Sequence, residues 1–362
     1  MAGVTLLVAR TVVTPPRRRP EDIRILSVDG AGDLVTLSST AESRLPGEYS
    51  LFFADGSGHA RVGDIVAESQ DFVIRRVLSV DRGDLARARR GRLSGWFYTG
   101  PADLGVSFEN VEIETELGPA PAWLVPSVVP STRWVIEVHG RAVRREETLR
   151  AVPVFRAAGY TSLLISYRND EDAPASLDGR YGLGDTEWHD VEAAIRYAVA
   201  HGATDVVLMG WSMGGATVLQ TLTRSELAGV VRGIVLDSPV IDWVTALRYQ
   251  GELLGLPSPI RSAVISLLGM KLASRLTGQH VPIDLSRLDF VRRSADLHVP
   301  VLLMHSDDDG FIPPTASLAL AEARPDIVTY VRFTVAGHTK LWNFDRTRWN
   351  DAIVQWLATT SL

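Results

Sequence analysis

Five short apolar runs constrain the fold of this chain more than any other feature. They cover residues 134–138, 161–166, 205–209, 233–236 and 299–304. A strand that is apolar along its whole length must be buried on both faces, and parallel strands need long crossovers, which are usually helices. From about Gly105 onward the pattern therefore predicts an α/β fold with a mostly parallel, doubly wound sheet. We expect helices over residues 146–158, 185–200 and 213–224, with a capping side chain at the start of the second.

The chain before Gly105 follows a different pattern. Short alternating runs, separated by turns, cover residues 23–28, 34–37, 49–53, 60–62 and 71–80. The first two flank the turn Asp29-Gly30-Ala31-Gly32-Asp33, and the next two flank a second glycine-containing turn, which is typical of two hairpins. We therefore expect a small β-rich domain over residues 1–105 and an α/β domain over residues 106–362.

Charge and composition exclude several classes of function. The formal net charge is −6, so nucleic acid is not an expected partner. The chain has no cysteine, which excludes disulfides, thiolate metal ligands and a cysteine nucleophile. The basic run at residues 87–92 is interpreted as a solvated face, because Asp81 and Asp84 lie beside it.

The first twenty residues do not resemble a secretory signal. The apolar stretch 4–9 is short, Arg10 interrupts it, and three arginines at 17–19 follow it, whereas a signal peptide carries its basic residues first. No other run reaches the about 18 apolar residues that a membrane span needs. We therefore expect a cytoplasmic protein without stable membrane insertion, and the sequence specifies no oligomeric state.

The stretch Gly210-Trp211-Ser212-Met213-Gly214-Gly215 carries the strongest chemical signal. It follows an apolar strand and opens a helix, which is the context of a nucleophile elbow. The flanking glycines remove Cβ atoms that would clash in such a tight turn, and the helix N-terminus places positive potential beneath the serine. Ser212 is therefore the expected nucleophile.

A serine hydroxyl needs a base, and the base needs a third group that orients it. Two later strands each end in suitable residues: the loop after residue 304 contains Asp307, Asp308 and Asp309, and the loop after residue 333 contains His338. Both loops follow strands of the predicted sheet, at the edge where ligands bind in open α/β folds. The order Ser, Asp, His along the chain fits this arrangement.

From about Gly105 to its end, the chain resembles the α/β-hydrolase family. The elbow matches residues 210–214, a segment similar to HGxxDxxVP matches residues 305–313 with Ser306 and Ile312 as departures, and a Gly-His motif matches Gly337-His338. The register of that segment assigns the acid to Asp309. Asp307, Asp308 and Asp237 remain alternatives, Asp237 because some members carry the acid after the preceding strand.

The resemblance also implies roles for the neighbouring residues. His338 would take the proton from Ser212, and Asp309 would orient the imidazole. The oxyanion hole would use the backbone amides of Met213 and Arg141. We assign substrate-binding positions to Trp211, His139 and Gly140, the last two shaping the turn before Arg141. His305 is interpreted as structural, and no metal site or cofactor is expected.

Residues 243–298 lie where this family commonly inserts a cap. The segment contains apolar stretches and few charges, so it is either an apolar lid over the serine or a set of packed helices. Arg141, Arg144 and Arg145 could bind a carboxylate, but solvated arginines at a helix start are the favoured interpretation.

The leading hypothesis is a cofactor-free serine hydrolase that cleaves carboxylic esters through an acyl-enzyme. The alternatives are a serine peptidase or aminopeptidase of the prolyl-oligopeptidase type, an acyltransferase or thioesterase, and a non-catalytic binding module with the same fold. The expected partner is a small ester or a short peptide.

Overall fold

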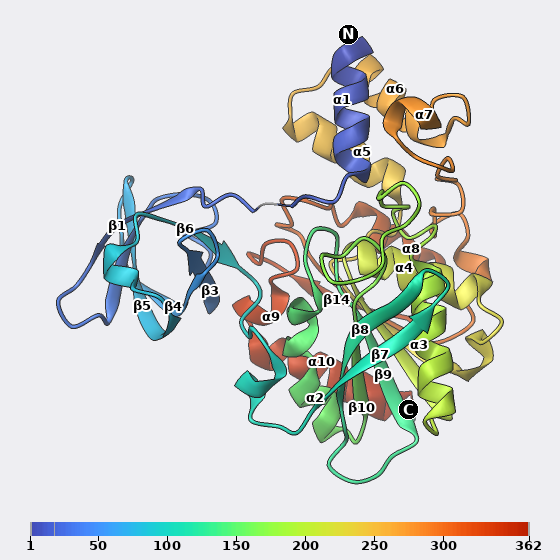
Figure 1. Cartoon of the computed structure of the whole chain (residues 1–362), viewed down its shortest axis with the longest axis horizontal. Helices are drawn as coiled ribbons and strands as arrows, with labels where there is room; N and C mark the ends of the chain where they lie inside the picture. Colours follow the sequence, from blue (N-terminus) through green and yellow to red (C-terminus); the bar gives the residue numbers. More distant parts are fainter. Residues whose placement is uncertain (1, 18, 361–362) are drawn as a thin grey trace.

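Two bodies of β-structure make up the molecule, a small barrel and a larger sheet covered by helices (Figure 1). The computed structural model describes residues 2–17 and 19–360. The barrel lies beside the α/β body, and a group of helices stands over one end of that body. The predicted α/β fold with a β-rich unit ahead of it is therefore confirmed.

Six strands close the barrel, namely β1 (Ile23–Val28), β2 (Leu34–Ser38), β3 (Tyr49–Phe53), β4 (Gly58–Glu68), β5 (Phe72–Arg82) and β6 (Arg90–Ser94). All neighbouring pairs are antiparallel, in the order β1-β2-β5-β4-β3-β6, and β6 pairs back onto β1. The hairpins β1–β2 and β3–β4 are the two predicted ones. Leu37, Leu51 and Val62 are completely buried inside, as the alternation of side chains along a strand requires.

The large sheet has eight strands: β7 (Glu109–Thr115), β8 (Gly118–Val125), β9 (Arg133–Val138), β10 (Thr161–Ile165), β11 (Asp205–Trp211), β12 (Val231–Asp237), β13 (Val301–Ser306) and β14 (Val328–Phe333). Their order is β14-β13-β12-β11-β9-β10-β8-β7. The six strands from β9 to β14 are parallel, as predicted. The antiparallel strands β7 and β8 form one edge and have no counterpart among the predicted strands.

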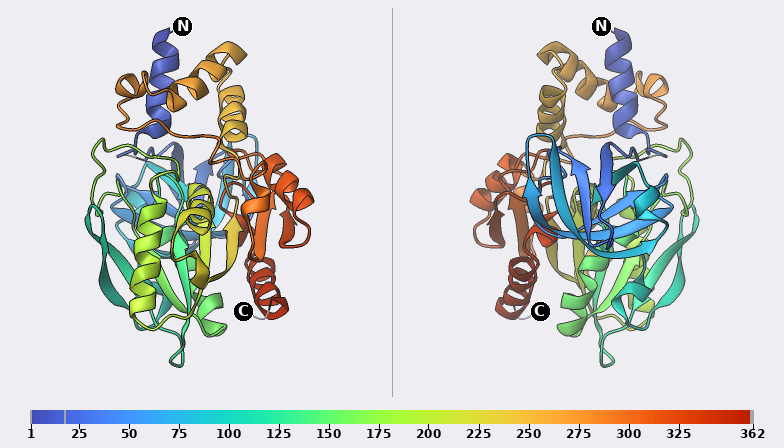
Figure 2. Two further views of the ribbon diagram at one scale, coloured as in Figure 1. Left: turned by 90° about the vertical axis from the view of Figure 1, so that its right-hand side faces the viewer. Right: turned by 90° about the vertical axis from the view of Figure 1, so that its left-hand side faces the viewer.

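Helices cover both faces of this sheet (Figure 2). One layer contains α3 (Trp188–Ala200), α4 (Met213–Arg224) and α8 (Thr315–Ala323), and the other contains α2 (Val152–Ala157) and α10 (Arg346–Thr359). Successive side chains of β11 alternate between the layers: Leu208 packs in the first, while Met209 and Trp211 pack in the second. The central runs are apolar at nearly every position because both of their faces are buried.

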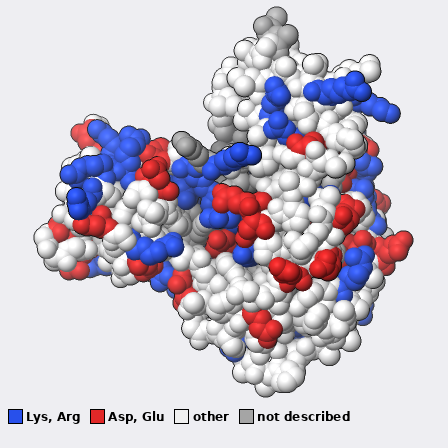
Figure 3. Space-filling model, viewed as in Figure 1, with Lys and Arg blue, Asp and Glu red and all other residues white. Residues whose placement is uncertain are grey.

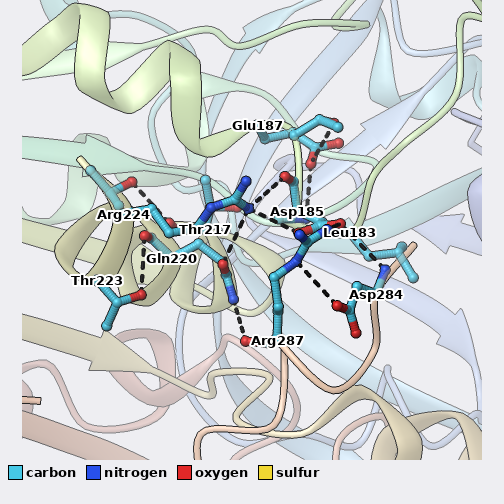
Figure 4. A network of polar contacts seen from close by, with 12 residues as sticks. Leu183, Asp185, Glu187, Thr217, Gln220, Thr223, Arg224, Asp284 and Arg287 are labelled. Carbon is cyan, nitrogen blue, oxygen red and sulfur yellow. Dashed lines mark hydrogen bonds and ion pairs between the residues drawn. The ribbon is translucent and has the colours of Figure 1, made fainter. Parts of the chain in front are cut away.

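Two of the predicted helices differ from the observed ones, one in where it begins and one in being divided. The helix expected over 185–200 begins at Trp188 and has no side-chain cap. Asp185 cannot cap it because its carboxylate accepts hydrogen bonds from Arg224 (2.9 Å) and Arg287 (2.8 Å) (Figure 4). The helix expected over 146–158 is divided into a 3-10 turn, Arg145–Arg150, and the α-helix α2.

The insertion between β12 and β13 is helical, as expected, and contains α5 (Trp243–Leu253), α6 (Ser258–Gly269) and α7 (Ser274–Thr277). The Asp185–Arg287 ion pair joins the end of this insertion to the α/β body (Figure 4). The N-terminal helix α1 (Ala2–Val13) packs against α6 and α7, away from the barrel to which the sequence analysis assigned it (Figure 1). The boundary at residue 105 stays a prediction.

Candidate active site

Ser212 occupies a strained turn between β11 and α4. Its backbone has φ 51° and ψ −116°, a conformation that non-glycine residues rarely adopt. A Cβ at Gly214 would lie 2.2 Å from the Val138 carbonyl oxygen, and one at Gly210 would lie 2.5 Å from the carbonyl oxygen of Gly214. Glycine is therefore required at both positions. The amide of Ser212 donates to the carbonyl of Asp237 (3.1 Å), which joins the turn to the neighbouring strand.

The structure brings Ser212, His338 and Asp309 together from three separate loops. The serine Oγ lies 2.9 Å from Nε2 of His338, and Nδ1 of the same ring lies 2.7 Å from Oδ2 of Asp309. The serine and the aspartate are both buried, with 6% and 2% of their surfaces exposed. This chain of hydrogen bonds can move a proton away from the serine hydroxyl.

The surroundings of Asp309 favour its ionised form. Oδ1 accepts the amides of Phe311 and Ile312, both at 2.8 Å, and Nε2 of His305 lies 3.3 Å from Oδ2. Burial by itself would raise the pKa of Asp309, but His338 and His305 hold it well below its ordinary value. His305 thus supports the acid, in line with the structural role expected of it.

The other three candidate acids have different partners. Asp307 pairs with Arg332, and Asp308 accepts the amide of Val335 at 2.6 Å. Asp237 is completely buried and accepts a hydrogen bond from the Trp349 indole at 2.9 Å. Among the described residues, only Asp309 carries a carboxylate that bonds to His338.

The loop after β9 approaches Ser212 closely. A Cβ at Gly140 would lie 3.2 Å from the serine Cβ. The amide of Gly140 donates to Glu147 (2.9 Å), and that of Ala142 donates to the Tyr181 hydroxyl (3.3 Å). Within the described part of the chain, the amide of Arg141 between them has no hydrogen-bond partner.

The side chain of His139 stabilises the loop after β9. Its ring is completely buried, stacks on Tyr167 at 4.2 Å between ring centroids, and places Nε2 2.8 Å from Oδ2 of Asp170. Burial alone would lower the pKa of His139, but the carboxylate of Asp170 raises it above its ordinary value. The amide of Met213, also beside the serine, has no hydrogen-bond partner among the residues that the structure describes, since the first residues of a helix have no helical carbonyl to bind.

A cavity of about 360 Å³ opens beside Ser212. Its lining is mostly apolar: α1 contributes Leu7, Val8, Thr11 and Val12, while α5 and α6 contribute further side chains that include Leu247 and Val264. None of these α1 residues was among the predicted site residues. Their apolar spacing at 4–9 was visible, but a short amphipathic run carries no information about which distant surface it covers.

The residues assigned to substrate binding do not line this cavity. Trp211 is completely buried in the apolar cluster on the face of the sheet opposite α4. Side chains alternate between the two faces along a strand, so the Trp211 side chain points away from the cavity. His139 and Gly140 shape the turn before Arg141, as expected, but neither is in the cavity wall. Arg141 itself does line the cavity.

The barrel supports the segment that follows His338. The Asn343 side chain donates to the carbonyls of Glu48 (2.7 Å) and Gly95 (3.2 Å) and accepts from Arg150 (2.7 Å). The same arginine donates to the carbonyl of Thr339 at 2.8 Å. Two loops of the barrel and a buried arginine of the α/β body therefore hold the residues next to the histidine.

Within residues 2–17 and 19–360, no group of three or more histidine, aspartate or glutamate side chains is arranged to hold a metal ion. In the same residues, no helix combines the length and the apolar character needed to cross a membrane.

Three comparisons relate this geometry to known proteins. A family model described as "Alpha/beta hydrolase family" matches residues 135–355, and one described as "Domain of unknown function (DUF8805)" matches residues 24–94, which is the barrel. No curated protein matches the chain.

Several solved structures share the fold. The Pyrococcus furiosus esterase Pf2001 is 17% identical, with a TM-score of 0.56 over 72% of this chain and 94% of that one. Est1E from Butyrivibrio proteoclasticus with ferulic acid bound is 16% identical, with a TM-score of 0.52 over 69% and 98%. At such low identity these likenesses establish the fold alone. The family model covers more than half of the chain, so this protein belongs to the α/β-hydrolase family.

Proposed function

We propose that the protein is a serine hydrolase that cleaves carboxylic esters through an acyl-enzyme. The observation that carries this proposal is the hydrogen-bonded chain from Asp309 through His338 to Ser212, which ends in the wall of an apolar cavity. A nucleophile, its base and an orienting acid are the groups that acyl transfer requires.

In the first half of the reaction, Nε2 of His338 accepts the hydroxyl proton while Oγ of Ser212 bonds to the ester carbonyl carbon. The carbonyl electron pair moves onto its oxygen, and the free amides of Met213 and Arg141 stabilise the resulting oxyanion. The bond to the alcohol oxygen then breaks. The imidazolium returns its proton to that oxygen, the alcohol leaves, and the acyl group stays on Ser212.

Water completes the cycle in the second half. His338 takes a proton from water as the water oxygen attacks the acyl carbon, and a second oxyanion forms in the same place. Its collapse breaks the bond to Oγ of Ser212 and frees the acid, while the imidazolium returns the proton to Oγ. Asp309 stays ionised throughout and stabilises the imidazolium, for which its lowered pKa is suited.

The cavity supports a hydrophobic acyl or alcohol group in the substrate. About 360 Å³ of mostly apolar space lies next to Ser212, enough for a medium chain or an aromatic ring. Two proteins of similar fold are described as an esterase and as a protein with ferulic acid bound, which agrees with an ester substrate.

Labelling with a fluorophosphonate, followed by peptide mapping, tests the nucleophile directly. We expect the label on Ser212, no label in Ser212→Ala, and full labelling of Ser266→Ala, whose serine is exposed on α6. Turnover of nitrophenyl esters of increasing chain length is measured beside an aminoacyl-nitroanilide. Turnover of the anilide alone would favour a peptidase, and a folded protein that takes no label would contradict the proposal.

A further inference from the structure

A second cavity, of about 720 Å³, lies where the barrel meets the α/β body. Phe52, Arg92 and Trp96 of the barrel region line it, together with Arg19 of the segment after α1 and Arg144 of the loop after β9. Figure 3 shows positive side chains gathered between the two bodies, next to a patch of acidic ones. The proposed reaction uses none of these residues.

Arg92 is the first unusual feature of this cavity. It is half-buried, and its guanidinium lies 4.7 Å from the centroid of the Phe52 ring. Its guanidinium makes no hydrogen bond and no ion pair with any residue that the structure describes. Burial, and then the neighbouring charge of Arg19, lower the pKa of Arg92 to about 10. A cation in this position lacks the partner that normally offsets its desolvation.

Two further cations make cation–π contacts with the ring of Trp96. The guanidinium carbons of Arg19 and Arg144 lie 4.3 Å and 5.6 Å from its ring centroid. Only 4% of Trp96 is exposed, and its indole N–H has no hydrogen-bond partner in residues 2–17 and 19–360. The positive charges of Arg19, Arg92 and Arg144 repel one another in this half-buried cavity, and a bound anion would offset that repulsion.

No described carboxylate forms an ion pair with Arg19 or Arg92, and Glu21 and Asp22 raise the pKa of Arg92 only from a greater distance. Glu171 pairs with Arg144 at 2.8 Å, and Glu21 accepts the amide of Gly56. Asp55 also lines the cavity but forms no ion pair with a described arginine. Of the three arginines, Arg144 alone has a carboxylate within 4 Å.

We propose that this cavity is a binding site for an oxyanion, the phosphate or carboxylate group of a small ligand, held by Arg92, Arg19 and Arg144. Guanidinium groups present paired N–H donors that match the geometry of such oxygens. The site is separate from the cavity beside Ser212 and shares no lining residue with it.

One contact connects this site to the proposed oxyanion hole. Nε of Arg19 donates to the carbonyl of Ala142 (3.0 Å), the residue that follows Arg141 and has φ 63°. An anion that holds Arg19 in place would therefore also hold the loop that carries the Arg141 amide. This link rests on the proposed function, whereas the binding of the anion does not.

Isothermal titration calorimetry with inorganic phosphate, at constant ionic strength maintained with chloride, tests the binding. We expect saturable binding to the full-length protein, at least tenfold weaker binding to Arg92→Gln and Arg19→Gln, and unchanged binding to Arg292→Gln, whose side chain is 85% exposed on the surface. Arg92→Lys, which keeps the charge without the paired donors, should bind with intermediate affinity. No saturable binding to the wild type, or equal affinity in the Arg92 variants, would overturn the proposal.

Two further arms distinguish the source of the oxyanion. Glycerol 3-phosphate and succinate are titrated in place of phosphate: tighter binding of either one indicates an organic ligand with that group, and tightest binding of inorganic phosphate indicates the free ion. The same titrations in Ser212→Ala should be unchanged, so a failure of the hydrolase proposal leaves the binding result intact. Phosphate should also change the kcat of ester turnover in the wild type but not in Arg92→Gln.

Discussion

The guanidinium of Arg141 donates a hydrogen bond to the carbonyl oxygen of Val12, at 3.0 Å, and so joins the loop beside the nucleophile to the end of the N-terminal helix. It also donates to the carbonyls of Thr11 and Thr14. The carbonyls of Thr11 and Val12 belong to the last turn of α1, and that of Thr14 follows it directly. Carbonyls at a helix C-terminus have no helical donor, so a cation there is favourable. One residue thereby offers its backbone amide to the proposed oxyanion hole and its side chain to the wall of the cavity.

The first prediction concerns the size of the cavity. Val8→Trp adds bulk to the α1 wall, so we expect turnover of long-chain nitrophenyl esters to fall at least tenfold in kcat/KM while that of the acetate ester stays within about twofold. In Val8→Ala, the ester chain length that gives the highest kcat/KM should become longer. Val4→Ala, at an exposed position outside the cavity wall, is the control. Identical chain-length profiles for all variants would exclude α1 from substrate binding.

The second prediction concerns the nucleophile and its base. Ser212→Ala and His338→Ala should each lower kcat by on the order of 10⁴-fold or more, because the two groups act as a unit. Both should melt within a few degrees of the wild type, since neither side chain is part of an apolar cluster. Near-normal turnover in either variant would disprove the assignment.

The third prediction separates the candidate acids. Asp309→Asn keeps the size of the side chain but loses the charge that orients the imidazole, so kcat should fall by about 10⁴-fold. Asp237→Asn should leave kcat within about tenfold, because Asp237 bonds to Trp349 and not to His338. The opposite ranking of the two variants would move the acid to the end of β12.

The fourth prediction concerns pH and stability. Complete burial raises the pKa of Glu137 to about 8, although the nearby side chains of Ser162 and Thr148 act in the opposite direction. Between pH 4.5 and 8 the unfolded chain ionises this group while the folded protein keeps it protonated. The folded state then binds the extra proton, so its stability falls as pH rises through this window.

Glu137→Gln removes this titration. Its free energy of unfolding should exceed that of the wild type by a few kcal/mol at pH 8, at about 1.4 kcal/mol per pH unit, and the difference should shrink toward pH 5. Urea unfolding at several pH values measures the difference. A gap that is the same at every pH would show that Glu137 is ionised in the folded protein.

The fifth prediction concerns the contact between the barrel and the segment after His338. Asn343→Ala leaves Arg150 and two carbonyls without their partner, so we expect a loss of about 3 kcal/mol in the free energy of unfolding and a lower kcat with little change in KM. Arg346→Ala breaks an exposed ion pair with Glu48 across the same interface and should cost less than about 1 kcal/mol. Equal effects of the two changes would contradict a role for Asn343 in positioning the histidine.

The features that depend on local chemistry could be predicted from the order of the residues alone. The five apolar runs became β9 to β13 because a strand buried on both faces has to be apolar throughout. The nucleophile elbow around Ser212 could be predicted for a similarly local reason, since its turn excludes any Cβ at Gly210 and Gly214. Both barrel hairpins followed from equally local patterns, whereas the insertion at residues 243–298 was expected from the resemblance to the family.

Contacts between residues far apart in the sequence depend on the folded arrangement of the chain. Composition cannot tell which of several aspartates turns toward His338, because that depends on the direction of one side chain at the end of β13. Trp211 points into the core and Val8 lines the cavity, the reverse of what proximity to Ser212 in the sequence suggests. A short apolar helix such as α1 packs on whatever surface the rest of the fold leaves uncovered, and that surface exists only once the chain has folded.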